Sequence, residues 1–120
     1  MSGERSRAKG RSRELDVLRY FRADGWVTYR LAWGNADVMA CKLVDGDEPE
    51  TQRMRLLLVQ VKCTGSGPYD HFRPMDRERL IAEADSCGAE AVLAWWPTYG
   101  ELQLIDAHQW PKRARLEAAA

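Results

Sequence analysis

The chain has 120 residues, a mass of 13.7 kDa and no formal net charge, because eighteen basic residues balance eighteen acidic ones. A chain of this length can bury one hydrophobic core, and 45% hydrophobic with 30% charged residues argues against wholesale disorder. No apolar run approaches the roughly 20 residues that span a membrane, and the polar, basic start does not resemble a secretory signal. The three cysteines form no CxxC pair, which argues against a zinc site or a disulfide scaffold. We therefore expect a cytoplasmic protein of one domain.

Hydrophobic periodicity and turn residues predict seven elements in the order α-β-β-β-α-β-β. They are a helix from about Arg11 to Asp24, strands at 26–31, 37–43 and 53–62, a helix at 75–87, and strands at 91–96 and 101–105. The third strand has apolar residues on both faces, which predicts a buried, central position in the sheet. The segments 44–52 and 64–74 contain Gly and Pro and are predicted to be loops. This order indicates an α/β fold in which helices flank a mixed sheet.

The expected domain covers residues 9–106, between a flexible basic segment at 1–8 and a basic tail at 107–120. Basic residues outnumber acidic ones at the start of the chain, where Glu4 is the one acid among the first thirteen residues. The basic residues there are Arg5, Arg7, Lys9, Arg11 and Arg13. Such patches bind polyanions even in a neutral chain, although a solubilising tail explains the same charge pattern equally well.

Polar residues stand at the ends of two predicted strands. Asp37 begins the second strand after a Gly-Asn turn, and Gln60-Val61-Lys62 ends the third strand. Because strand side chains alternate between faces, Gln60 and Lys62 should point the same way. An unpaired buried ammonium is costly, so Asp37 is a candidate partner of Lys62. From spacing alone, strand-end charges that reach solvent are the favoured interpretation.

Several short motifs occur in a fixed order along the chain. They are Lys9-Gly10, Glu14, Gly25-Trp26, Asp37-Val38-Met39-Ala40, Gln60-Val61-Lys62 with Thr64, Asp70-His71, the pattern of Asp76, Arg79 and Leu80, and the apolar run 91–96. In this order, from about Lys9 to Ile105, the chain resembles the archaeal-type Holliday junction resolvases, a family of the PD-(D/E)xK nuclease superfamily. The resemblance implies a restriction-endonuclease-like fold.

The resemblance also implies an activity: a metal-dependent endonuclease that resolves four-way DNA junctions by phosphodiester hydrolysis, as a homodimer. Its catalytic positions match Glu14, Asp37, Gln60 and Lys62. A Mg²⁺ or Mn²⁺ ion would be held by Asp37, the side-chain oxygen of Gln60 and the Val61 carbonyl, with Glu14 completing the set directly or through a metal-bound water. Lys62 would either orient the attacking water or meet the developing negative charge. The residues expected to contact DNA are Arg5, Arg7, Lys9, Arg11, Arg13 and His71.

Position 60 departs from the family, which has Glu where this chain has Gln. A Gln oxygen has similar geometry but one negative charge less, and hard divalent ions prefer anionic oxygen. The site is therefore either a weaker metal cage or that of a weakened or inactive junction-binding module of the same fold. A small Ser or Thr often found before the catalytic Asp is also missing from the segment Trp33 to Ala36.

Two further functions remain as alternatives. The first is a nuclease for other branched DNA or for DNA ends. The second is a protein-interaction domain, which would leave the basic N-terminus and the Glu14, Asp37 and Lys62 set unexplained. The adjacent Trp95 and Trp96 should point to opposite faces of a strand, so one is expected in the core. The other should be exposed unless something covers it, and a second subunit is a candidate for that cover.

Overall fold

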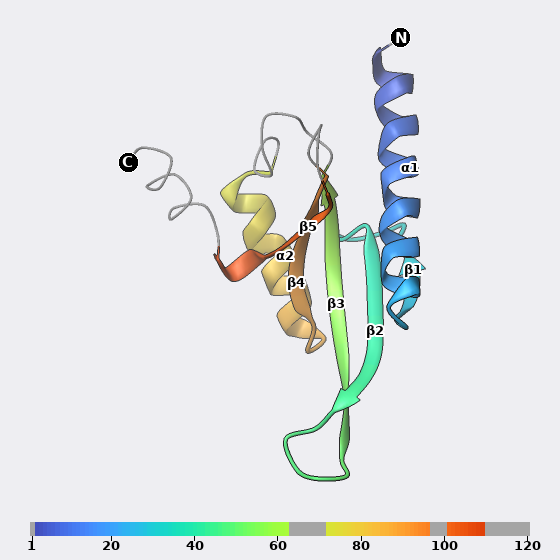
Figure 1. The fold of residues 1–120 in the computed structure, drawn as a ribbon. Helices are drawn as coiled ribbons and strands as arrows, with labels where there is room; N and C mark the ends of the chain where they lie inside the picture. Colours follow the sequence, from blue (N-terminus) through green and yellow to red (C-terminus); the bar gives the residue numbers. More distant parts are fainter. Residues whose placement is uncertain (1, 63–71, 97–100, 110–120) are drawn as a thin grey trace, which may run out of the picture.

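The structure is a computed structural model that describes residues 2–62, 72–96 and 101–109, with side chains from residue 12 onward. In these residues a five-stranded mixed sheet lies between two helices, α1 (Ser2–Ala23) on one face and α2 (Pro74–Ser86) on the other (Figure 1). The strands are β1 (Val27–Arg30), β2 (Val38–Asp45), β3 (Gln52–Lys62), β4 (Glu90–Trp95) and β5 (Gln103–Asp106). They lie in the order β1-β2-β3-β4-β5, and the pair β3–β4 is parallel while the other pairs are antiparallel.

The predicted order of elements and the α/β class are confirmed, and β3 is the central strand. Helix α1 begins at Ser2 rather than near Arg11, so it includes most of the segment 1–8 that was expected to be a flexible arm. Strand β2 continues to Asp45, into the segment predicted as a loop. A short 3₁₀ helix, η1 (Ala107–Gln109), begins the expected tail, and the rest of that tail lies outside the described residues.

The core has two layers, one on each face of the sheet. On one face, α1 packs Val17 and Phe21 against Leu57 and Val59 of β3. On the other face, Leu80 and Ala84 of α2 form a cluster with Leu58 of β3 and with Ala91 and Leu93 of β4. Successive residues of β3 therefore serve opposite layers, as the alternation of strand side chains requires. This alternation explains why β3 reads as an unbroken apolar run.

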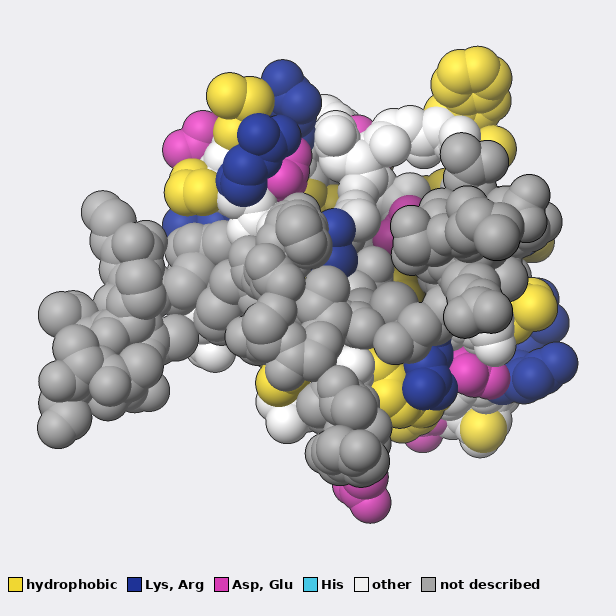
Figure 2. Space-filling view, turned by 90° about the horizontal axis from the view of Figure 1, so that it is seen from above, with side chains coloured by type: hydrophobic (Ala, Val, Ile, Leu, Met, Phe, Trp, Pro, Cys, Tyr) yellow, Lys and Arg dark blue, Asp and Glu magenta, His cyan; other side chains and the backbone are white. Residues whose placement is uncertain are grey.

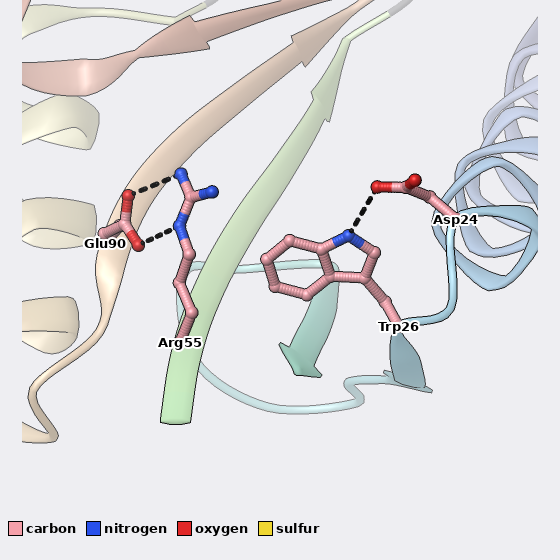
Figure 3. Close-up of polar contacts among 4 residues, drawn as sticks. All are labelled: Asp24, Trp26, Arg55 and Glu90. Atoms are coloured by element: carbon pink, nitrogen blue, oxygen red, sulfur yellow. Dashed lines mark hydrogen bonds and ion pairs between the residues drawn. The ribbon is translucent and has the colours of Figure 1, made fainter. Parts of the chain in front are cut away.

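A bidentate ion pair joins the amino ends of β3 and β4. The Arg55 guanidinium donates to both carboxylate oxygens of Glu90, at 2.7 and 2.9 Å (Figure 3). Beside it, the Trp26 indole N–H donates to Asp24 at 3.1 Å, and the Arg55 guanidinium carbon lies 5.6 Å from the Trp26 ring centroid. Glycine at position 25, with φ of +86°, turns the chain from α1 toward β1.

The carboxyl ends of β3 and β4 lie together at the other end of these strands, away from the Arg55–Glu90 ion pair. A parallel pair joined through a helix gathers its carboxyl ends at one edge, where sites form in open α/β sheets. The amino-terminal half of α1 extends beyond the sheet at this same end of the molecule (Figure 1). Among the helices of the described residues, none combines the length and the apolar character of a membrane span.

Candidate active site

A cavity of about 310 Å³ opens at the carboxyl end of β3. Its lining comes from the end of β3, the segment that leads into β2, and the first turn of α2 with the residues just before it. The lining residues are Gly34, Asn35, Asp37, Gln60, Lys62, Phe72 and Asp76. The structure thus brings together Asp37, Gln60 and Lys62, three of the four residues at which the sequence predicts catalysis. The side chains of Gln60 and Lys62 share one face of β3, as the alternation predicted.

Backbone and side-chain hydrogen bonds fix Asp37 against β3. The Asp37 N–H donates to the Val59 carbonyl at 2.8 Å, and the Asp37 carbonyl accepts the Leu31 N–H at 2.8 Å. Its side-chain Oδ2 accepts the Val61 N–H at 2.8 Å. The carbonyl of a strand residue points to the same side as its N–H, so the Val61 carbonyl is also directed toward the β2 side, near this carboxylate.

The carboxyl of Asp37 has a raised pKa. Burial is the largest cause, because it removes water from the charged form. The Val61 N–H opposes this by stabilising the carboxylate, and the negative charge of Glu14 raises the pKa further. The positive charges of Lys62 and Arg30 lower it, without cancelling the effect of burial. A cation bound at Asp37 would stabilise the ionised carboxylate against this cost of burial.

Lys62 and Asp76 bring opposite charges to the cavity. The Lys62 ammonium lies 5.8 Å from the ring centroid of buried Phe72. Asp76 is in the first turn of α2, where its Oδ2 accepts the Arg73 N–H at 3.0 Å. That hydrogen bond is the main cause of a lowered pKa at Asp76, and the charge of Lys62 adds to the lowering. Asp76 is therefore a stable anion opposite the positive end of β3.

Glu14 does not line the cavity. It lies on α1 with only 17% of its side chain exposed, and the Arg30 Nε donates to it at 3.3 Å. Its charge nevertheless raises the pKa of Asp37, so the two carboxyls are electrostatically coupled. Arg30 interacts with both, which makes it a member of the site that the sequence did not reveal. Its only sequence signal is a charge at the end of a short strand.

Within the described residues, no three His, Cys, Asp or Glu side chains are grouped as a metal site. The residues with side-chain oxygens that line the cavity are Asp37 and Asp76, which are carboxylates, and Gln60 and Asn35, which are amides. The Val61 backbone adjoins Asp37 through its N–H. These are hard ligands of the kind that Mg²⁺ and Mn²⁺ accept. The residues therefore fit such an ion, because they offer oxygen donors and one of these is a buried carboxyl. The site has less negative charge than it would have with Glu at position 60.

The residues predicted to contact DNA are only partly described. Arg13 pairs with Asp16 at 3.4 Å, and its guanidinium carbon lies 4.6 Å from the Trp96 ring centroid. His71 lies outside the described residues, and so do the side chains of the other predicted contacts, Arg5, Arg7, Lys9 and Arg11, although all four belong to α1. Viewed onto this end of the molecule, Lys and Arg side chains also gather over α2 (Figure 2). Its exposed basic residues include Arg73 and Arg79.

Trp95 and Trp96 do point to opposite faces of the sheet, but neither is strongly exposed. Trp96 packs against the α1 layer and carries the Arg13 guanidinium on its ring, and Trp95 is half-buried. The cover that the expectation required is supplied within the chain, because α1 covers Trp96, and a subunit interface at this pair stays a prediction. The strongly exposed aromatic residue is Trp33, in the loop before β2, with 89% of its surface exposed.

The sheet order and the flanking helices define an α/β fold in which a polar cavity lies at the end of the central strand. No family model matches the chain, and no curated protein is significantly similar to it in sequence. Among solved structures, the chain is similar to Hjc of Archaeoglobus fulgidus, a Holliday junction resolvase from an archaeal hyperthermophile. The TM-score is 0.64 at 22% identity, over 83% of this chain and 74% of that one. The expected restriction-endonuclease-like fold is confirmed by this likeness.

Proposed function

We propose that this protein is a metal-dependent, structure-selective DNA endonuclease that cuts four-way junctions by phosphodiester hydrolysis and acts in DNA recombination and repair. The observation that carries the proposal is the convergence of Asp37, Gln60 and Lys62 on one cavity at the carboxyl end of β3. The fold is that of Hjc, whose described activity is Holliday junction resolution. The cavity is polar and opens at the end of the molecule from which α1 extends (Figure 1).

A Mg²⁺ or Mn²⁺ ion would be held by Asp37, the Gln60 side-chain oxygen and the Val61 carbonyl, with Glu14 completing the set from α1. When bound, such an ion polarises a phosphodiester and lowers the pKa of water. Asp37 contributes a carboxylate that the Val61 N–H holds in place. Its burial makes the ionised form costly without a cation, which favours binding of one.

Lys62 supplies a positive charge on the same face of the strand as Gln60. A scissile phosphate in the cavity would place its oxygens near this ammonium, where the charge developing during hydrolysis is stabilised. Asp76 also lines the cavity and provides a negative counter-charge to Lys62. The separation of these charges orients the phosphate between β3 and α2.

DNA binding is proposed to come from the basic residues of α1 and α2 at the open end of the sheet. Contacts of Lys and Arg to phosphates give affinity that does not depend on base sequence. The described residues contain no motif that enters a groove to read bases, which favours recognition by shape.

We also propose a homodimer, because a symmetric pair of cuts requires two active sites. The exposed apolar residues that suit an interface lie on the half of the sheet that α2 leaves open. They are Val27, Tyr29, Leu43 and Met54, on one face of β1, β2 and β3. A light-scattering mass of 13.7 kDa, that of a single chain, at the concentrations used for cleavage would rule the dimer out.

A junction-binding module without strong catalysis is the second candidate. It is favoured by Gln60 and by the lack of a three-carboxylate cluster among the described residues. Both candidates place DNA over the same cavity, so binding alone does not separate them.

Cleavage of a synthetic four-way junction, compared with a linear duplex of equal length, tests the proposal. Cuts in the junction that require Mg²⁺ or Mn²⁺ and disappear with chelator are expected. Tight junction binding without cuts in either metal would favour the binding module. Equal cutting of duplex and junction would contradict structure selectivity.

A further inference from the structure

Trp33 is the most exposed large hydrophobic residue among the described side chains, at 89%. Tryptophan is highly buried on average, so nearly complete exposure calls for a reason. Its sequence neighbours Ala32, Gly34 and Asn35 are small or polar, so the indole is the one large apolar group that this loop presents. A single isolated ring suits a flat aromatic ligand better than a broad protein interface.

The loop that carries Trp33 is fixed at its base and near its tip. At the base, the Leu31 N–H donates to the Asp37 carbonyl at 2.8 Å. Near the tip, the Asn35 N–H and side-chain amide both donate to Glu83 of α2, at 3.1 and 2.8 Å. The φ of +88° at Gly34 favours glycine, and a Cβ there would displace the Glu83 carboxylate from its present position. The indole is therefore presented by a loop that is held in one place.

This loop also forms part of the candidate active site. Gly34 and Asn35 line the cavity together with Asp37, and Trp33 immediately precedes them. A phosphate at Asp37 would bring the adjoining nucleotides to this rim. Positive side chains lie on the elements at either side, Arg30 on β1 and Arg73 before α2. The surroundings of the ring thus suit a polyanion that carries aromatic groups.

We propose that Trp33 stacks on a base face exposed at the branch point of DNA and so selects junctions over continuous duplex; this inference rests on the proposed nuclease function. In an intact duplex the faces of the bases are covered by their neighbours, whereas a branch point interrupts the stack. Base stacking on an aromatic side chain is sequence-tolerant, which agrees with recognition by shape. Glu83 is the positioning residue that holds the loop.

The test compares Trp33→Ala, Trp33→Phe and unaltered protein for affinity to a four-way junction and to a linear duplex, with chelator present to prevent cutting. From the usual worth of base stacking, Trp33→Ala should weaken junction binding by about 5- to 150-fold and leave duplex binding unchanged. Trp33→Phe should retain most of the affinity. Tyr20→Ala is the matched control, since Tyr20 is another exposed aromatic residue, at 49%, in the last turn of α1 and outside both the cavity lining and the proposed interface, and it should change neither affinity.

A second readout reports stacking directly. With 2-aminopurine placed at the branch point, unaltered protein should quench its fluorescence and Trp33→Ala should not. Glu83→Ala, which releases Asn35, should reduce junction selectivity although Trp33 is still present. Unchanged selectivity in Glu83→Ala would contradict the role of the fixed loop.

Three results would overturn the inference. The first is an equal loss of junction and duplex affinity in Trp33→Ala, and the second is no loss of either affinity. The third is a lower light-scattering mass for Trp33→Ala than for the unaltered protein, which would show that a second copy covers the ring. Because these measurements concern binding, they are independent of catalysis. If the unaltered protein did not cut junctions, the proposed nuclease activity would be refuted, while the binding measurements would still test stacking by Trp33.

Discussion

The two ends of the parallel pair β3–β4 hold their buried or half-buried carboxyls in opposite ways. At the amino end, Glu90 receives two hydrogen bonds from Arg55, and this partner lowers the pKa of Glu90 (Figure 3). At the carboxyl end, burial raises the pKa of Asp37 despite the Val61 hydrogen bond. One end therefore has a carboxylate matched by its own cation, and the other has a carboxyl that lacks enough positive charge.

A carboxylate paired within the protein and a desolvated carboxyl without enough positive charge have different consequences. A bidentate Arg–carboxylate pair is complete in itself and needs no ligand. A desolvated carboxyl remains costly to ionise until a cation arrives, and perturbed groups of this kind gather at functional sites. The same strand thus has one end that only holds the sheet together and one end suited to chemistry.

Replacing Asp37 by Asn should produce the largest effect. Cleavage should fall by at least roughly 10³-fold, because the charge stabilisation that a metal supplies is worth several kcal/mol. Junction binding should remain, since it depends on Lys and Arg. Parallel assays of cutting and binding check this, with Glu90→Gln at the other end as a control that should cut normally. Normal cutting by Asp37→Asn in Mg²⁺ would show that the site is misassigned.

Removing the basic residues of α1 should produce the next largest effect. The variant replaces Arg5, Arg7, Arg11 and Arg13 by Ala. Each lost phosphate contact should reduce the slope of log K against log salt by about one unit. Arg53→Ala, at the amino end of β3, is the control and should leave the slope unchanged. If the quadruple variant kept the original slope, the run would act only as a solubilising segment.

Gln60→Glu should increase the contrast between the two ends, because it adds a negative charge at the carboxyl end of β3. The two side chains are nearly isosteric, so the packing of β3 should survive. Metal affinity and the cleavage rate should rise several-fold, about 1 kcal/mol, because hard ions prefer anionic oxygen. Junction cleavage across a Mg²⁺ titration measures both. Identical affinity and rate in the two proteins would mean that position 60 does not touch the metal.

The smallest effects should appear in stability, with opposite dependence on pH at the two ends. Because the folded pKa of Asp37 is raised, its contribution is present below the ordinary Asp pKa of about 4 and is lost as pH rises through the folded value. For Glu90 the folded pKa is lowered, so its contribution is present above about 4 and is lost as pH falls through the folded value.

Urea unfolding with chelator, from pH 3 to 7, would measure these contributions. Asp37→Asn should gain stability over the unaltered protein as pH rises. Glu90→Gln should lose about 0–1 kcal/mol at neutral pH, since both partners of its pair are about half exposed. If both variants changed stability in the same direction at pH 7, the contrast between the ends would not hold.

The sequence predicted the elements because local patterns carry them. Alternation and unbroken apolar runs identified β3 as central, and the same period of two placed Gln60 and Lys62 on one face. The motif order from Lys9 to Ile105 indicated both the fold and the position of Asp37. These inferences needed only the spacing of residues along one strand or helix.

Contacts between distant segments decided the rest. No local pattern pairs Glu14 with Arg30, brings Asp76 into the cavity or ties Asn35 to Glu83. Likewise, the covering of Trp96 by Arg13 and the exposure of Trp33 follow from how α1 and the loop pack on the sheet. The raised pKa of Asp37 is of the same kind, because desolvation depends on every atom that surrounds a carboxyl and not on its neighbours in sequence.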